Sequence, residues 1–268
     1  VVQTHPNIST AKSGVKFGID PGPAMDIFLN HKNYQNIEFT GIDVHLGSQI
    51  LSFDPYFETL KKLKLFMNKL EDRGLKLKHL DLGGGFGSPY HGGDIFHIKE
   101  FGEQVAPILN DFDCEIFFEP GRFITSNCGA LISKVLYTKE SGNKNILLLD
   151  TSMTEIIRPI LYQSYHEILP VELINSREHI TYDVVGPVCE SSDYLAKGRE
   201  LQKGEPGDLV AIMSAGAYAS VMSSNYNVRR KPPEIIVDGS AWHITRSRET
   251  YDHLIYDERV IDDLIKIP

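Results

Sequence analysis

The sequence predicts an α/β unit followed by an antiparallel β domain, with the boundary near residues 123–130. Up to about Arg122, short apolar runs alternate with stretches of helical periodicity, which favours parallel strands joined by helical crossovers. After Asn127 the chain contains short β-rich runs split by Gly, Pro and Asn, and no long helical pattern separates them. Its 268 residues are enough for one large domain or two moderate ones.

Three strand patterns define the first half. Residues 41–48 (GIDVHLGS), 78–85 (KHLDLGGG) and 114–122 (CEIFFEPGR) each run from an apolar stretch into a polar or glycine-rich turn. A helix is predicted between the first two strands, and a weaker helical pattern spans Ile98 to about Leu109. In such strand–helix units, functional groups gather at the carboxyl ends of the strands.

The helix between the first two strands has start and stop signals. Asp54 is expected to be the N-cap, with Pro55 in the first helical position, and Gly74 supplies the C-terminal stop. The apolar residues at helical spacing are Phe57, Leu60, Leu63, Phe66, Met67 and Leu70.

Short β-rich runs make up the second half. Their length and the turn residues between them predict a separate antiparallel β domain or barrel. The runs cover residues 130–139, 144–150, 179–186, 207–213 and 233–239.

Composition and charge argue against several classes of function. The 27 basic and 36 acidic residues give a net charge of −9, which disfavours a nucleic-acid or acidic-membrane partner. No apolar run is long enough for a transmembrane helix, and the first ten residues lack a charged-then-apolar signal pattern. Cys114, Cys128 and Cys189 have neither disulfide nor zinc spacing, so we expect a cytoplasmic, reducing environment and no metal.

Polar and glycine residues follow the ends of the three predicted strands. His45 and Ser48 follow the first, the glycine run of DLGGGFGS (81–88) the second, and Glu119 and Arg122 the third. Backbone N–H groups, a hydroxyl and a guanidinium on one rim would suit a phosphate monoester. The glycine run alone is equally compatible with a tight turn, because a serine replaces the last glycine of the Gly-x-Gly-x-x-Gly pattern.

Several motifs occur in a fixed order along nearly the whole chain. They are THPNIST (4–10), KFGID (16–20), HLGSQI (45–50), LDLGGGFG (80–87), FEPGR (118–122), RPILYQSYHEI (158–168), GPVCESSD (186–193) and SAGAYASVMSSNYN (214–227). Together they resemble the signatures of the fold-III pyridoxal-phosphate-dependent decarboxylases, and so many motifs in one order are specific to that family.

The resemblance implies both a fold and a reaction. The fold would be the C-terminal portion of a (β/α)8 barrel over residues 1–125, followed by an antiparallel β-barrel or sandwich domain over residues 126–268 with substrate and dimer contacts. The cofactor would be pyridoxal 5'-phosphate, and the protein would be a homodimer with shared active sites. The implied reaction is the decarboxylation of meso-2,6-diaminopimelate to L-lysine and CO₂.

The resemblance also assigns cofactor-binding residues. Glu119 would pair with the pyridine nitrogen, and His45, a catalytic residue, would stack on the ring. The plain alternative for Glu119 is a surface turn residue, and for His45 a structural histidine. The apolar strand before Glu119 is expected to be buried, which favours the functional role of Glu119. Backbone N–H groups of the glycine run would bind the phosphate. The other residues implied are Ser48, Gly83, Gly84, Gly85, Pro120, Gly121, Arg122 and Tyr218.

Substrate and catalytic residues are implied on both halves of the chain. Arg158 and Tyr162 would bind the distal carboxylate together with Arg122, because a guanidinium fits a carboxylate bidentately. Ornithine and arginine lack a second carboxylate and would leave a buried arginine unpaired. A lone cysteine is more often a small buried hydrophobe. By the resemblance, Cys189 protonates the substrate carbon in the neighbouring subunit's site. The remaining substrate-binding residues are Glu190, for the distal amino group, and Tyr218.

One residue that the family requires is absent from this chain. The family attaches its cofactor to a lysine in a Tyr-Ala-x-Lys-like motif on an early barrel strand, and no such motif occurs here. We therefore expect this chain to be the C-terminal part of a longer protein. Two alternatives stay open, namely a related decarboxylase of another amino acid and a non-catalytic decarboxylase-like binding protein. The sequence upstream of Val1 would discriminate between enzyme and non-enzyme.

Overall fold

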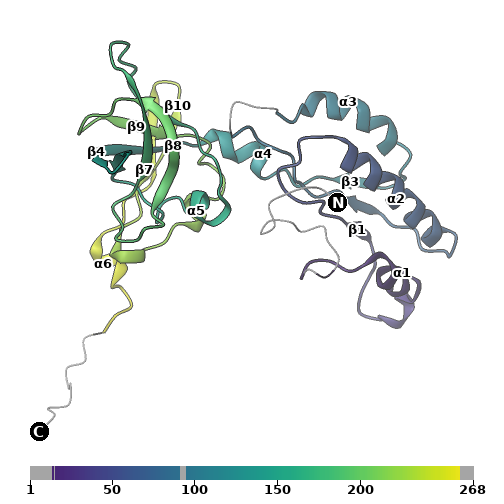
Figure 1. The fold of residues 1–268 in the computed structure, drawn as a ribbon. Coiled ribbons are helices and arrows are strands. Elements are labelled where there is room, and N and C mark those ends of the chain that lie inside the picture. Colours follow the sequence, from purple (N-terminus) through teal and green to yellow (C-terminus); the bar gives the residue numbers. More distant parts are fainter. Residues whose placement is uncertain (1–13, 15, 91–94, 260–268) are drawn as a thin grey trace, which may run out of the picture. The chain divides into compact units, whose positions relative to one another are not determined.

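The computed structural model describes residue 14 and residues 16–90 and 95–259. The chain forms two compact units, residues 1–129 and 130–268 (Figure 1). Each unit has its own hydrophobic core. The motif THPNIST (4–10) lies outside the described residues. None of the described helices combines the length and apolarity that a membrane span requires.

The first unit contains a parallel three-stranded sheet in the order β1-β2-β3. Helix α2 connects β1 to β2, and helix α3 connects β2 to β3, so the predicted parallel strands with helical crossovers are confirmed. The elements are α1 (Pro21–Leu29), η2 (His31–Asn33), β1 (Gly41–Asp43), α2 (Asp54–Glu71), β2 (His79–Asp81), α3 (Ile98–Leu109), β3 (Glu115–Phe117), α4 (Arg122–Thr125) and η3 (Ser126–Cys128).

Each strand of this sheet is only three residues long, shorter than its sequence pattern. Single backbone hydrogen bonds continue beyond the formal strand ends. Val44 N–H donates to the Asp81 carbonyl at 3.0 Å, and Glu119 N–H donates to the Gly83 carbonyl at 2.8 Å. The polar residues after the three strands are therefore held side by side, although they no longer form a regular ladder.

Helix α2 begins one residue earlier than its sequence signals indicate. Phe53 is the N-cap, Asp54 is the first helical residue, and no side chain caps the helix, so the prediction of an Asp54 cap is wrong. The Phe53 ring lies 5.1 Å from the Phe96 ring centroid and 5.5 Å from that of Phe101, so aromatic packing fixes this end of the helix. The predicted stop is confirmed, because Gly74 has φ +81° and follows the last helical turn.

Aromatic side chains dominate the core of the first unit. Tyr56 stacks on Phe86 with ring centroids 5.2 Å apart, and both lie within contact of Phe96 and Phe101. Tyr56 is fully buried. The sequence pattern placed neighbouring residues but not Tyr56 on the apolar face of α2, so this buried residue was missed.

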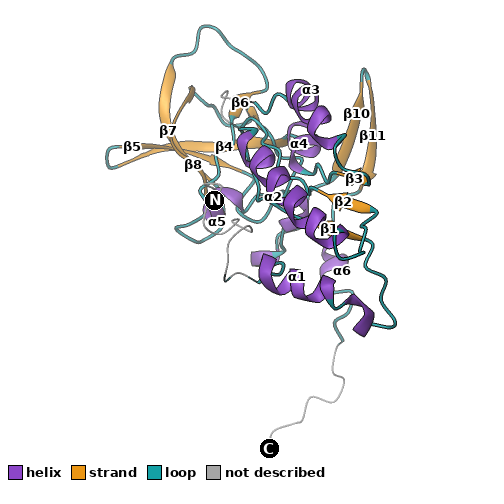
Figure 2. Ribbon diagram, turned by 90° about the vertical axis from the view of Figure 1, so that its right-hand side faces the viewer, coloured by secondary structure: helices purple, strands orange, loops and turns teal. Residues whose placement is uncertain are grey.

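The second unit is built from strands (Figure 2). Six strands form one sheet in the order β6-β9-β4-β5-β7-β8, and β10 and β11 form a separate hairpin. The elements are β4 (Leu131–Ser141), β5 (Lys144–Leu149), α5 (Arg158–Tyr162), β6 (Ile168–Pro170), β7 (His179–Val185), β8 (Tyr194–Gln202), β9 (Leu209–Ile212), η4 (Ser220–Met222), η5 (Tyr226–Val228), β10 (Glu234–Asp238), β11 (Ala241–Arg246) and α6 (Tyr251–Leu254).

All five β-rich runs of the sequence contain strands, but the sheet is not wholly antiparallel. Strands β5 and β7 pair in parallel, with Asn145 opposite Tyr182. Their connection passes through α5 and β6, which gives it the length that a parallel crossover needs. Strands β6, β8 and β11 were not predicted, because β6 has three residues, β8 carries three charged residues, and β11 is exposed on both faces.

Candidate functional site

The glycine run DLGGGFGS lies where the ends of the three parallel strands meet. A Cβ on Gly83 would be 2.9 Å from His45 Nδ1, and one on Gly84 would overlap the carbonyl oxygen of Glu119. A Cβ on Gly85 would be 2.5 Å from the Gly47 carbonyl oxygen. Glycine is thus required at these positions because the neighbouring strand ends approach the loop more closely than a side chain would allow.

Hydrogen bonds orient the peptide groups of this loop. The Gly83 carbonyl accepts from Glu119 N–H at 2.8 Å, and the Gly84 carbonyl accepts from the Tyr56 hydroxyl at 2.9 Å. In a trans peptide the next N–H points the opposite way, so the N–H groups of Gly84 and Gly85 face away from these partners. Across residues 16–90 and 95–259, neither N–H donates to a protein acceptor. Burial raises the pKa of the Tyr56 phenol, which therefore stays a donor.

The Gly83 N–H has a different role from the one the sequence indicates. It donates to the Asp81 carboxylate at 2.8 Å, within the same turn. Gly83 has φ +62°, a left-handed conformation that glycine adopts without strain. The backbone donors that remain for an anion are therefore those of Gly84 and Gly85.

Ser48 and Arg122 come together beside the loop. Arg122 donates to Ser48 Oγ from Nε at 3.3 Å and from Nη2 at 3.1 Å. Its Nη1 also donates to the Tyr90 hydroxyl at 2.8 Å. Since Ser48 accepts in these contacts, its own O–H proton is available to donate to an anion. Tyr90 was missed by the sequence reasoning, although it lies only two residues after the glycine run.

Glu119 and His45 lie on either side of the glycine run, at the ends of β3 and β1. Both side chains are exposed. The expectation that Glu119 follows a buried strand is wrong, because β3 is an edge strand of the three-stranded sheet and Phe117 is 46% exposed. Pro120 Cα lies 3.8 Å from the position of a Gly84 Cβ, and Gly121 is the N-cap of α4. The first unit thus brings together all of its sequence-predicted site residues.

In the second unit, a buried polar network joins three loops. The Glu155 carboxylate accepts from Ser152 N–H at 2.7 Å and from Arg229 Nη2 at 3.3 Å. Asp193 Oδ1 accepts from Met153 N–H at 2.7 Å, and burial raises the pKa of Asp193 against the effect of its backbone donors. The segment 150–155, which directly precedes α5, is therefore fixed to the loop 186–193 and to the segment 224–229.

Cys189 and Glu190 lie in the loop between β7 and β8, and both are exposed. Asn227 Nδ2 donates to Cys189 Sγ at 3.5 Å. Hydrogen bonds from Ser192 and Tyr226 lower the pKa of Glu190, so its carboxylate is ionised at neutral pH. Glu190 in turn raises the pKa of the Tyr226 phenol. The loop presents a thiol and an anionic carboxylate to solvent.

Arg158 and Tyr162 are the first and last residues of the one-turn helix α5. Arg158 is buried, with 4% of its surface exposed. Its Nη1 contacts His166 Nε2 at 3.1 Å, and its Nη2 donates to Ser164 Oγ at 3.3 Å. Tyr218 is 48% exposed and has φ +59°, in the same unit. His166 has no role in the sequence prediction, although it lies in the motif that contains Arg158.

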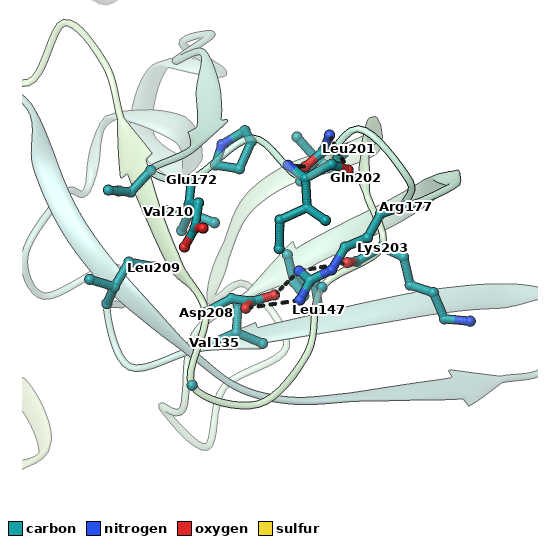
Figure 3. A pocket seen from close by; sticks show the side chains of 15 residues that line it. Val135, Leu147, Glu172, Arg177, Leu201, Gln202, Lys203, Asp208, Leu209 and Val210 are labelled. Atoms are coloured by element: carbon teal, nitrogen blue, oxygen red, sulfur yellow. Dashed lines mark hydrogen bonds and ion pairs between the residues drawn. The ribbon is translucent and has the colours of Figure 1, made fainter.

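A cavity in the second unit lies elsewhere. It has a volume of about 270 Å³ and is lined by residues of β4, β5, β8 and β9 and by the loop around Arg177 (Figure 3). Arg177 pairs there with Asp208. None of the predicted site residues lines it. Within the described ranges, no group of His, Cys, Asp and Glu side chains is arranged to hold a metal ion.

Comparison with known proteins identifies the family. The family described as "Pyridoxal-dependent decarboxylase, C-terminal sheet domain" matches residues 26–216. This chain belongs to that decarboxylase family. Diaminopimelate decarboxylase of Haemophilus influenzae is 42% identical over 252 residues, which are 94% of this chain and 60% of the relative. Diaminopimelate decarboxylase of Aquifex aeolicus is 37% identical over 254 residues, with the same two coverages.

Solved structures agree with this membership. The crystal structure of diaminopimelate decarboxylase from Helicobacter pylori complexed with L-lysine matches with a TM-score of 0.89 and 36% identity, over 96% of this chain and 64% of that protein. The crystal structure of diaminopimelate decarboxylase from M. jannaschii in co-complex with L-lysine matches with a TM-score of 0.87 and 32% identity, over 98% of this chain and 62% of that protein. The chain spans about 60% of the length of the curated relatives it matches.

Proposed function

We propose that this chain is the C-terminal part of a pyridoxal-phosphate-dependent enzyme that converts meso-2,6-diaminopimelate to L-lysine and CO₂. The buried Arg158 carries the choice of substrate, because a guanidinium in this position suits an amino acid with a second carboxylate. Similarity to diaminopimelate decarboxylases along 94% of the chain supports it. The parallel sheet of the first unit would be one part of a (β/α)8 barrel whose remaining strands, with the cofactor lysine, belong to the rest of the protein.

The first unit fits the phosphate and ring of the cofactor. The N–H groups of Gly84 and Gly85 donate to no protein acceptor among the described residues, and Ser48 and Arg122 lie beside them. These groups would bind the phosphate, with Gly83, Pro120 and Gly121 shaping the loop. Pyridoxal phosphate, when bound, supplies an electron-withdrawing ring that stabilises the electron pair left as CO₂ departs.

Side chains of the same unit would orient the ring. The Glu119 carboxylate would accept a hydrogen bond from the protonated pyridine nitrogen and keep the proton there. The His45 imidazole, beside Gly83, would cover one face of the ring and exclude water from it. Both side chains are exposed in this unit, so a ligand can reach them.

Residues of the second unit would recognise the substrate. Arg158 and Tyr162, with Arg122, would bind the distal carboxylate, Tyr218 would contact both cofactor and substrate, and the ionised Glu190 would bind the distal amino group. The Cys189 thiol would give its proton to the carbon that has lost CO₂, so a C–H bond replaces the C–C bond. Exposure of Cys189 and Glu190 supports a role at a site completed by a second subunit, in a cytoplasmic homodimer.

Substitution of Arg158 tests the choice of substrate in the full-length protein. Arg158→Ala should lower kcat/KM for diaminopimelate by roughly one to two decades, since a charge-assisted contact contributes about 1.5–3 kcal/mol. The affinity for pyridoxal phosphate, measured by fluorescence titration, should stay within a factor of about two to three of wild type, because Arg158 is proposed to bind the substrate and not the cofactor.

Arg158→Lys is the matched control, because it keeps the charge but not the planar fork, and it should fall between wild type and Arg158→Ala. An unchanged kcat/KM in Arg158→Ala would show that the second carboxylate binds elsewhere. The choice of diaminopimelate would then have lost its support.

A further inference from the structure

His166 lies buried between Arg158 and the backbone of the segment that follows β9. Only 1% of its surface is exposed. Its Nδ1 is 2.9 Å from the Met213 carbonyl oxygen, and its Nε2 is 3.1 Å from Arg158 Nη1. The imidazole thus links helix α5 to the end of strand β9.

The two partners determine which ring nitrogen carries the proton. A carbonyl oxygen can only accept, so Nδ1 donates to Met213. A guanidinium can only donate, so Nε2 accepts from Arg158. The imidazole is therefore neutral with its proton on Nδ1. Ser164 Oγ also accepts from the guanidinium, at 3.3 Å from Nη2, so the imidazole and the hydroxyl both orient Arg158.

The backbone around His166 is itself fixed. Arg199 of β8 donates from Nη1 to the His166 carbonyl at 2.9 Å, and its guanidinium lies 3.9 Å from the centroid of the Tyr165 ring. Met213 N–H donates to the Glu167 carbonyl at 2.8 Å, next to the side-chain contact with His166. The imidazole can change neither position nor tautomer without breaking several of these bonds.

We propose that His166 is a positioning residue for substrate recognition: it holds the Arg158 guanidinium in the orientation that meets the second carboxylate of the substrate. This inference rests on the function proposed above and adds a determinant of specificity to it. A positioning role predicts a loss that is selective for ligands with that carboxylate. A merely structural role predicts a loss that is equal for all ligands.

Two substitutions separate the two contacts of the imidazole. In His166→Asn the side-chain amide can still donate to Met213, but no atom reaches Arg158. In His166→Gln the amide oxygen reaches the former Nε2 position and can accept from Arg158. The probes are L-lysine, which keeps the second carboxylate, and cadaverine, which has none. Binding of each is measured by calorimetry on the full-length holoenzyme.

We expect His166→Asn to weaken L-lysine binding about tenfold, the size of one lost charge-assisted hydrogen bond, and to leave cadaverine binding unchanged. His166→Gln should recover most of the loss. Ser164→Ala, which removes the hydroxyl that also accepts from Arg158, should show the same selectivity if His166→Asn does not fold. His179→Asn, at an exposed strand start, should match wild type in both titrations.

Unchanged L-lysine binding in His166→Asn, or equal losses for L-lysine and cadaverine, would overturn the positioning role. Failure of the proposed function looks different, because the wild-type enzyme itself would then bind L-lysine no better than cadaverine.

Discussion

Gly84→Ala should destabilise the first unit by more than about 4 kcal/mol and abolish cofactor binding in the full-length protein. The added Cβ would overlap the Glu119 carbonyl oxygen, and a backbone atom cannot move aside as a side chain can. Displacement of Glu119 would also break its hydrogen bond to the Gly83 carbonyl. Urea unfolding followed by circular dichroism at 222 nm measures the effect, since α2 and α3, the two longest helices among the described residues, belong to this unit.

Gly102→Ala is the control for this experiment. Gly102 lies within α3, and a Cβ there would meet no atom within 4 Å. The same substitution should therefore stabilise the unit by about 0.5–1 kcal/mol, the usual gain from replacing a helical glycine. If Gly84→Ala were as stable as Gly102→Ala, the close approach of the strand ends would not be what requires the glycine run.

Cys189→Ala should lower kcat by about 10²–10⁴, the usual contribution of a positioned general acid. Cofactor affinity should not change, because no residue of the phosphate loop is altered. Release of CO₂ from labelled substrate measures kcat. Cys128→Ala, at another exposed cysteine, should retain wild-type activity. Equal activity of the two variants would remove Cys189 from the reaction.

Mixed dimers test whether Cys189 acts in the neighbouring subunit. Subunits with Cys189→Ala are combined with subunits that lack the cofactor lysine, and each homodimer is nearly inactive. If two-fold symmetric sites are shared, a mixed dimer has one site with both defects and one with neither. About half of randomly reassorted dimers are mixed, so recovery should approach about a quarter of wild-type activity. No recovery despite demonstrated exchange would place Cys189 in its own subunit's site.

Sequence patterns predicted the elements whose signal is local. Helix α3 has the predicted bounds, and all five β-rich runs of the second half contain strands. The patterns failed where a distant partner decides. Phe53 begins helix α2 because it packs on Phe96 and Phe101, and β3 is exposed because it lies at the edge of the three-stranded sheet. No single-strand pattern shows the parallel pairing of β5 and β7.

The candidate site shows the same division. The order of the motifs identified the candidate site residues, and those of the first unit lie together at its strand ends. The contacts that orient them come from elsewhere in the chain. Tyr56 fixes the Gly84 peptide from a helix, and His166 is positioned by the Met213 carbonyl, which is 47 residues away in the sequence. A motif gives no information on such partners.

The most direct test is the turnover of meso-2,6-diaminopimelate by the full-length protein loaded with pyridoxal phosphate. We expect L-lysine and CO₂ in equal amounts. The kcat/KM for diaminopimelate should be at least about 100-fold above those for L-ornithine and L-lysine as substrates, because their only carboxylate is the one to be removed and the buried recognition group stays unpaired. Preference for ornithine or lysine, or no decarboxylation of any of the three, would contradict the proposed function.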